Sequence, residues 1–492
     1  MHTSWESTDK QERCGKMEFM LQEATIRQLQ QAMEAGEQTA VSMTTAYLQR
    51  IAEIDQDGPM LRSVIELNPD AIYIAMQMDQ ERAAGRIRSE LHGIPVLIKD
   101  NINTGDHMHT TAGSLALSDS FAPEDAFLVK RLRAAGAVIL GKTNLTEMAN
   151  FMAIDMKNGY SSRGGQTLNP YGPGQLDVGG SSSGSGAAVA ANLCVVAVGT
   201  ETDGSIMSPS ANNSLVGIKP TLGLISRTGI IPITYTQDTA GPMARTVTDA
   251  VILLGILAGQ DEQDAATLVS PAEPVDYTAS LDPDGLRGAR IGINRYYMKD
   301  LTEEERTIME ASIEAMRHAG AVIVEGTNLP ESAQEPTVLL YEFKSALNRY
   351  LSTLGPGAPV RTLKEMIDYN HLHHRETLKY GQQILLAAEY ETSGRMTESK
   401  YIQHRLQYLK NAREDGIDRL LREHQLDAIF SPRFTDTPAV AGYPCIIVPA
   451  GYRRDGLPFG INFMGTAYSE PELIRIAYAF EQVVPARRSP VL

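Results

Sequence analysis

The stretch between Gly179 and Pro220 constrains the fold of this 492-residue chain more than any other part of its sequence. It holds two Gly/Ser clusters, GGSSSG at 179–184 and TDGS at 202–205, separated by a small-residue helical pattern and an apolar, β-branched run. Glycine adopts backbone angles closed to other residues, and serine hydroxyls can attack a substrate or relay a proton. Each cluster alone is typical of an ordinary loop. Together, held by packed apolar segments, they favour an active site made of backbone amides and hydroxyls.

Strands alternate with helices through the first half of the chain. Residues 94–98 and 195–199 are short apolar runs typical of buried strands, whereas 125–135 and 184–192 have helical patterns. This alternation predicts an α/β fold with a covered sheet. Further elements are expected over these ranges: helices at 25–54, 69–85 and 470–481, and strands at 137–140, 289–293, 321–324, 428–430 and 446–448. The late strands predict one large domain in which they rejoin the early sheet.

Composition narrows the classes of partner. The formal net charge of −16 argues against broad binding to nucleic acid or to anionic membranes. No apolar run approaches the roughly 18–20 residues of a membrane helix. Residues 1–20 are polar and mixed in charge, which predicts a disordered leader rather than a signal peptide, with Met17 or Met20 as an alternative start. Three scattered cysteines without metal-binding spacing indicate a reduced, cytoplasmic protein.

Two motifs suggest ligands that their sequence context does not support. GAVILGKT at 136–143 matches the nucleotide-binding pattern GxxxxGK[ST], but its middle residues form an apolar strand and a helix precedes it. We interpret this match as accidental. His371, His373 and His374 have no Asp, Glu or Cys cluster nearby, so we expect a solvated helix face rather than a metal site. His92 is interpreted as a turn residue rather than a base.

Lys99 ends the apolar run of residues 94–98. Burial there would disfavour the charged ammonium, lower the lysine pKa and produce a general base near neutral pH. The alternative is a lysine that snorkels to solvent from the end of a strand. The residues of this run alone leave both interpretations open.

Several motifs taken in order resemble the amidase signature family, from about Thr25 to the C-terminus. They are Lys99 after GIPVLI, then GGSSSGSGAAVAA, GTETDGSI, LVGIKPTLG, DTAGPMARTVTDA and AGYP. A chance match to all of these is not credible. The resemblance implies a single large α/β domain over 21–492, with a mixed, mostly parallel central sheet flanked by helices. It also implies a signature core at about 90–260 and a more helical, charged insertion at about 281–424.

The resemblance implies a Ser–Ser–Lys triad. Carried over by position, Ser205 would be the nucleophile, Ser181 the bridging serine and Lys99 the base. Ser181 typically follows a cis peptide bond in this family, here Gly180–Ser181. The oxyanion hole would consist of backbone N–H groups from one turn: Thr202, Asp203, Gly204 and Ser205. This chemistry needs no metal and no cofactor.

Within the family, TETDGS at 200–205 looks more like bacterial peptide amidases, which release ammonia from the C-terminal amide of peptides. A peptide amide is therefore the best single expectation for the substrate, among peptide and small-molecule amides. Met207 stands where many relatives have arginine, so an anionic group is less suited to that place, and Val178 is a minor departure. The segment 431–438 is shorter than in peptide amidases, where it helps to wall the substrate pocket.

Other functions remain as alternatives. The first is the amidase subunit of a tRNA-dependent amidotransferase, which requires partner subunits and glutamine as the ammonia donor. The second is an amidase for small aryl or aliphatic amides. A non-catalytic binding protein on the same fold is disfavoured because all three triad positions are intact. The sequence also leaves the oligomeric state open, including a homodimer.

Overall fold

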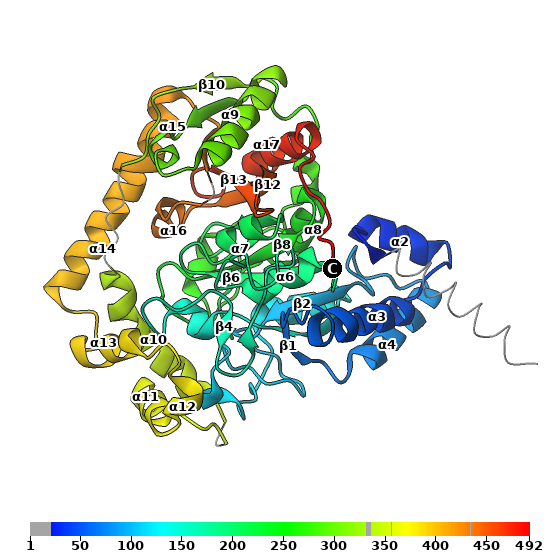
Figure 1. Ribbon diagram of the computed structural model, residues 1–492, viewed down its shortest axis with the longest axis vertical. Helices are drawn as coiled ribbons and strands as arrows, with labels where there is room; N and C mark the ends of the chain where they lie inside the picture. Colours follow the sequence, from blue (N-terminus) through cyan, green and yellow to red (C-terminus); the bar gives the residue numbers. More distant parts are fainter. Residues whose placement is uncertain (1–20, 331–335, 356, 433) are drawn as a thin grey trace, which may run out of the picture.

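The computed structural model describes residues 21–330, 336–355, 357–432 and 434–492, so the leader expected at 1–20 lies outside the described residues. One central sheet runs through the molecule with helices packed around it (Figure 1). Its strands follow in this order across the sheet: β1 (Val64–Leu67), β3 (Val138–Thr143), β2 (Pro95–Lys99), β6 (Val196–Glu201), β8 (Thr239–Ala244), β7 (Val216–Lys219), β12 (Cys445–Tyr452), β13 (Pro458–Met464), β11 (Ala428–Pro432), β9 (Arg290–Ile293) and β10 (Val322–Val324). The prediction of a single α/β domain whose late strands rejoin the early sheet is confirmed.

The parallel strand pairs form two separate groups, one on each side of an antiparallel middle. β2 pairs in parallel with β3 and β6, and β9 pairs in parallel with β10 and β11. The middle, from β6 through β8, β7, β12 and β13 to β11, is antiparallel. The sheet is thus mixed as predicted, but the expected excess of parallel pairs holds only within each half. Parallel neighbours need a crossover connection, and β12 and β13 are joined without a helix.

The helical pattern of residues 25–54 forms two helices, α2 (Ile26–Glu34) and α3 (Ala40–Arg50). Thr25 and Thr39 precede them, and each threonine hydroxyl accepts a hydrogen bond from a backbone N–H of the first turn. The other helices around the sheet are α4 (Ala71–Ala83), α5 (Phe127–Ala134), α6 (Ser183–Ala190), α7 (Met207–Asn212), α8 (Val247–Leu257), α9 (Glu303–His318), α15 (Asp418–His424), α16 (Thr437–Ala441) and α17 (Glu470–Val483).

The charged segment 281–424 occupies two places. Its strands β9 and β10 join one edge of the sheet, with α9 packed beside them. Five further helices lie along the side of the molecule (Figure 1): α10 (Thr337–Thr353), α11 (Leu363–Leu372), α12 (His374–Thr377), α13 (Gln383–Glu391) and α14 (Ser399–Ala412). Phe343 and Leu347 of α10 share an apolar cluster with Leu145 and Met148, which follow β3. This packing holds α10 near the carboxyl ends of the parallel strands.

Residues of the two misleading motifs adopt the structures expected for them. Val138–Thr143 form the buried strand β3 rather than a phosphate-binding loop. His371, His373 and His374 are exposed, and the described residues contain no group of three or more potential ligands placed to hold a metal ion. His92 lies in a turn.

Two further observations concern the environment of the cysteines and the length and apolarity of the helices. Cys194 and Cys445 are buried, unpaired thiols among apolar side chains. In the part of the chain that the structure describes, no helix combines the length and apolarity needed to cross a membrane.

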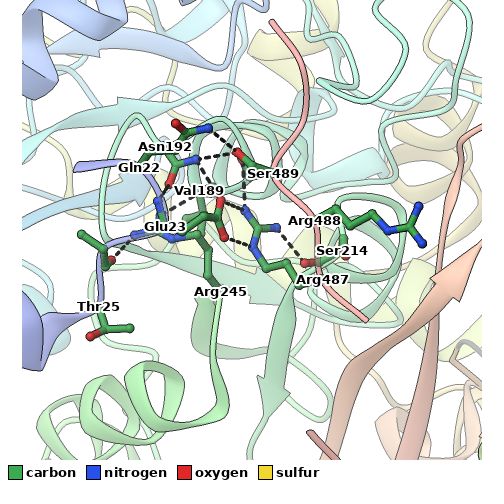
Figure 2. A network of polar contacts seen from close by, with 12 residues as sticks. Gln22, Glu23, Thr25, Val189, Asn192, Ser214, Arg245, Arg487, Arg488 and Ser489 are labelled. Carbon is green, nitrogen blue, oxygen red and sulfur yellow. Dashed lines mark hydrogen bonds and ion pairs between the residues drawn. The ribbon is translucent and has the colours of Figure 1, made fainter. Parts of the chain in front are cut away.

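Residues from both ends of the described chain meet at the end of α6, as Figure 2 shows. Arg487 donates to the two carboxylate oxygens of Glu23 at 2.6 and 2.8 Å. The same guanidinium donates to the carbonyl oxygens of Ala190 at 3.2 Å and Ser214 at 2.9 Å. Asn192 Oδ1 accepts the Glu23 backbone N–H at 2.8 Å. Because these contacts join four distant segments, the C-terminal segment helps to fix α6.

We expect Arg487→Ala to lower the free energy of unfolding by about 2 kcal/mol, because it removes the Arg487 hydrogen bonds to the Glu23 carboxylate and to two carbonyl oxygens. Arg454→Ala is the matched control: Arg454 pairs with Glu304 at 3.0 Å but its side chain is 90% exposed. The control should cost less than about 0.5 kcal/mol. Denaturant unfolding of both variants measures the difference, and equal losses would contradict the role assigned to Arg487.

Candidate active site

Lys99 ends β2 with its side chain fully buried. Its Nζ donates to Ser181 Oγ at 2.8 Å, to Ser182 Oγ at 2.9 Å and to the carbonyl oxygen of Thr200 at 3.1 Å. All three partners are neutral oxygens. Burial lowers the pKa of Lys99 to about 7, against a smaller raising effect of the Glu201 and Asp238 carboxylates. The lysine is therefore buried rather than snorkelled to solvent.

The serine run before α6 supplies both hydroxyls that face Lys99. The peptide bond Gly180–Ser181 is cis, as the family resemblance implies. Ser182 Oγ donates to the Thr200 carbonyl oxygen at 3.0 Å and accepts the Thr200 N–H at 3.2 Å. Because the Ser182 hydroxyl hydrogen is already engaged, Ser182 can only accept from Lys99. The Ser181 hydroxyl has no such second bond among the described residues, so its hydrogen can point to the lysine.

The turn Thr202–Ser205 connects β6 to α7 and is held from both sides. Glu201 Oε2 accepts the backbone N–H groups of Ile206 at 2.6 Å and Met207 at 3.0 Å. Asp238 Oδ1 accepts the Thr202 hydroxyl at 2.6 Å, and burial raises the pKa of this carboxyl. The N–H groups of Gly204 and Ser205 donate to no acceptor within the residues that the structure describes. The turn thus offers rigid backbone donors to a bound group.

Ser205 lies beside the serine run through the main chain. The backbone N–H of Ser182 donates to the carbonyl oxygen of Ser205 at 3.1 Å, and Ser205 is 8% exposed. No hydrogen bond joins the hydroxyls of Ser181 and Ser205 in the described part of the chain. The structure therefore brings Lys99 into contact with Ser181, and Ser205 into contact with the neighbouring residue. Hydrogen bonds of catalytic groups are often long without substrate and tighten in its complex.

Phe434 covers the turn Thr202–Ser205 at Gly204. Gly204 has a φ of +75°, and a Cβ added there would lie 2.3 Å from Cε2 of the Phe434 ring. Phe434 belongs to the segment 431–438, so this segment reaches the turn. Met207 is buried in an apolar cluster with Ile206.

A cavity of about 810 Å³ lies beside the turn. Thr200, Glu201 and Thr202 line it, whereas Lys99, Ser181 and Ser205 are not among its lining residues. Its apolar wall comes from Ile230–Ile233, and Ala346 and Tyr350 of α10 also line it. Cavities of this volume accommodate ligands larger than a simple amide.

The residues that support the site were not predicted from the sequence. Ser182 stands in the same serine run as Ser181, and Glu201 stands in the motif before Ser205, so both lay within recognised motifs. Asp238 belongs to the motif QDTAGP, but nothing in this motif indicates a contact with Thr202, which is 36 residues away in the chain. Its role depends on the loop that folds back onto the turn.

Comparison with known proteins identifies the family. The family model described as Amidase matches residues 42–439. The chain belongs to the amidase family. It is an amidase, a hydrolase of carbon–nitrogen bonds in amides, and it has the fold of the solved amidase structures.

Several relatives of this amidase cover nearly its full length. The solved peptide amidase of Stenotrophomonas maltophilia is 50% identical, with a TM-score of 0.91 over 95% of this chain and 98% of that chain. A protein of Arabidopsis thaliana named a probable amidase is 41% identical over 96% of this chain and 92% of its own length. The A subunit of the glutamyl-tRNA(Gln) amidotransferase of Thermosynechococcus vestitus is 33% identical over 94% and 98% respectively.

We expect Gly204→Ala to lower the free energy of unfolding of the amidase by about 2 kcal/mol, through backbone strain and the collision with Phe434. Phe434→Ala removes the ring, so the double variant should be more stable than the sum of the single effects predicts. Denaturant unfolding of the four proteins gives this coupling. Additive losses would mean that the ring does not cover Gly204.

Proposed function

We propose that the amidase hydrolyses carboxamides with a Ser–Ser–Lys triad in which Ser205 is the nucleophile, Ser181 the relay and Lys99 the base. One observation carries the proposal: the buried Lys99 Nζ lies 2.8 Å from Ser181 Oγ and contacts no carboxylate among the described residues. A lysine held among neutral oxygens loses its proton more readily than one in an ion pair. It can therefore act as a base near neutral pH.

The hydrogen bonds around Lys99 determine the direction of proton transfer. A neutral lysine has two N–H donors and one lone pair. Ser182 Oγ and the Thr200 carbonyl oxygen can only accept from Lys99, so they take the two donors. The lone pair is left to face the Ser181 hydroxyl. Ser181 then gives its proton to Lys99 and accepts one from Ser205, which becomes nucleophilic.

The reaction proceeds through an acyl-enzyme. Ser205 Oγ bonds to the amide carbon, and the carbonyl oxygen becomes an oxyanion that accepts from the turn Thr202–Ser205. The carbon–nitrogen bond then breaks, and the relay returns the proton to the leaving nitrogen, which departs as ammonia. Water next attacks the acyl carbon, giving its proton to the same relay. Ser205 is released, the product is a carboxylic acid, and no redox step or cofactor is involved.

We further propose that the substrate is the C-terminal amide of a peptide. The likeness to the peptide amidase of Stenotrophomonas maltophilia supports this choice, at 50% identity over nearly all of both chains. The cavity beside Thr202 supports it as well, because its volume exceeds what a small aliphatic amide fills.

The relative that belongs to an amidotransferase supports a second candidate, the role of an amidase subunit that works with partners on glutamine. A panel of peptide amides, aryl amides, indoleacetamide and glutamine distinguishes these functions. Release of ammonia from peptide amides by the isolated chain favours the first candidate. Release from glutamine that requires added partner subunits favours the second.

Ser205→Ala should lower kcat/KM for a peptide amide by a factor of roughly 10⁴ or more, because the acyl-enzyme can no longer form. Ser352→Ala is the matched control, since the Ser352 hydroxyl donates to the Arg349 carbonyl oxygen at the surface. It should retain the wild-type rate. An ammonia-release assay measures both variants, and a Ser205→Ala protein with substantial activity would exclude the mechanism.

The pH dependence follows from the lowered pKa of Lys99. Only the neutral lysine is a base, so kcat/KM should rise about tenfold per pH unit below pH 7 and level off above it. Glu201→Gln removes a carboxylate that raises the pKa of Lys99, so the midpoint of the profile should move to lower pH. A profile that falls between pH 6 and 8 would contradict the assignment of the base.

A further inference from the structure

Two asparagines line the cavity directly after the strand that ends in Lys99. Asn101 and Asn103 are 2% and 4% exposed, and both contribute to the cavity wall. Their main chain is paired with a neighbouring segment: the Ile231 N–H donates to the Asn101 carbonyl oxygen, and the Asn103 N–H donates to that of Gly229, each at 2.8 Å. Alternate residues of an extended chain share one side, so this paired segment presents both amides together.

The carboxamide of Asn101 is oriented but only partly satisfied. Its Nδ2 donates to Thr200 Oγ1 at 3.0 Å, which determines the direction of the amide. Its Oδ1 is buried and accepts no hydrogen bond from the described residues. A buried carbonyl without a donor costs about 1–3 kcal/mol. Such an acceptor in a cavity wall is suited to an N–H group of a ligand.

The carboxamide of Asn103 complements that of Asn101. The Tyr350 hydroxyl of α10 donates to Asn103 Oδ1 at 2.7 Å, so the oxygen side of this amide is occupied. Asn103 Nδ2 donates to no acceptor within the described ranges of the chain. The two side chains therefore offer one free acceptor, on Asn101, and one free donor, on Asn103.

We propose that Asn101 and Asn103 bind a peptide group of the substrate, on the acyl side of the reacting amide. The substrate N–H donates to Asn101 Oδ1, and the substrate carbonyl oxygen accepts from Asn103 Nδ2. A peptide group has one donor and one acceptor and carries no charge, which matches this pair. The inference rests on the proposed function, because it assumes that the acyl chain extends from the turn into the cavity.

The walls of the cavity agree with a peptide ligand. Thr202 belongs both to the cavity wall and to the turn next to Ser205, so a carbonyl held at the turn has its acyl chain beside the asparagines. The apolar residues Ile230–Ile233 and the ring of Tyr350 provide a surface for a substrate side chain. The carboxylates of Asp238 and Asp264, which line the cavity, already accept hydrogen bonds from Thr202 and Arg227. The free polar atoms of the two asparagines carry no charge.

The proposed pair predicts a substrate preference, which is measured as the ratio of kcat/KM for two amides. The enzyme should favour an N-acetyl dipeptide amide over the amide of a simple carboxylic acid, because only the former has a peptide group for the pair. Asn103→Leu keeps the branched shape of the side chain and removes both its Nδ2 donor and the Oδ1 that accepts the Tyr350 hydroxyl. It should lower the ratio of kcat/KM for the dipeptide amide to kcat/KM for the simple amide by about tenfold.

Two further variants make the test specific. Tyr350→Phe leaves the Asn103 amide in place but removes the hydroxyl that orients it, so the ratio should fall in the same direction by a smaller factor. Thr353→Val is the matched control: Thr353 also lines the cavity, but its hydroxyl donates to the Tyr350 carbonyl oxygen of its own helix at 2.7 Å. The control should keep the wild-type ratio.

The outcomes separate the inference from the function on which it rests. Wild-type activity on both amides with an unchanged ratio in Asn103→Leu and Tyr350→Phe would overturn the peptide-binding pair alone. An equal fall in the Thr353→Val control would also overturn it, because any change of the cavity would then have the same effect. A wild-type protein that releases ammonia from neither amide would refute the proposed function and the inference with it.

Discussion

The burial of one lysine among neutral oxygens is the constraint on which the proposed site depends. Lys99 contacts Ser181, Ser182 and the Thr200 carbonyl, and the two carboxylates that raise its pKa, Glu201 and Asp238, are hydrogen-bonded elsewhere. Glu201 accepts backbone N–H groups at the start of α7, and Asp238 accepts from Thr202 and from the loop before it. The same two carboxylates thus shape the turn Thr202–Ser205 and leave the lysine without an ion pair in the described part of the chain. Desolvation then dominates its pKa.

Burial alone does not make a base, as a second lysine shows. Lys142 is also fully buried, and burial lowers its pKa to about 8 against the raising effect of Asp100. Its Nζ donates to the Ile102 carbonyl oxygen and to Thr110, neither of which belongs to a turn with free backbone donors. Lys99 differs because its hydroxyl partner stands next to the residue that bonds to Ser205. Burial lowers the pKa of both lysines, and the position of Lys99 relative to the turn is what distinguishes it as the proposed base.

Much of the fold could be predicted from the sequence, and the missed parts have physical reasons. Apolar, β-branched runs predicted β2, β3 and β6, but β8 contains Gly241 and Pro242, which are unfavourable in strands and depend on pairing with β6 and β7. The family resemblance assigned Lys99, Ser181 and Ser205. The supporting contacts lay beyond its reach, because Tyr350 and Asn103 are 247 residues apart and only the packing of α10 brings them together. The short segment 431–438 was expected to alter the pocket wall, and it places Phe434 over Gly204.

The central claim is that Lys99 activates Ser205, and labelling with a fluorophosphonate tests it most directly. The reagent loses fluoride to an activated serine, and peptide mapping by mass spectrometry identifies the modified residue. The account predicts phosphonylation of Ser205, with a rate that increases with pH to a plateau above about pH 7. It also predicts that Lys99→Ala loses this reactivity. Labelling of another residue, or undiminished labelling of Ser205 in Lys99→Ala, would contradict the account.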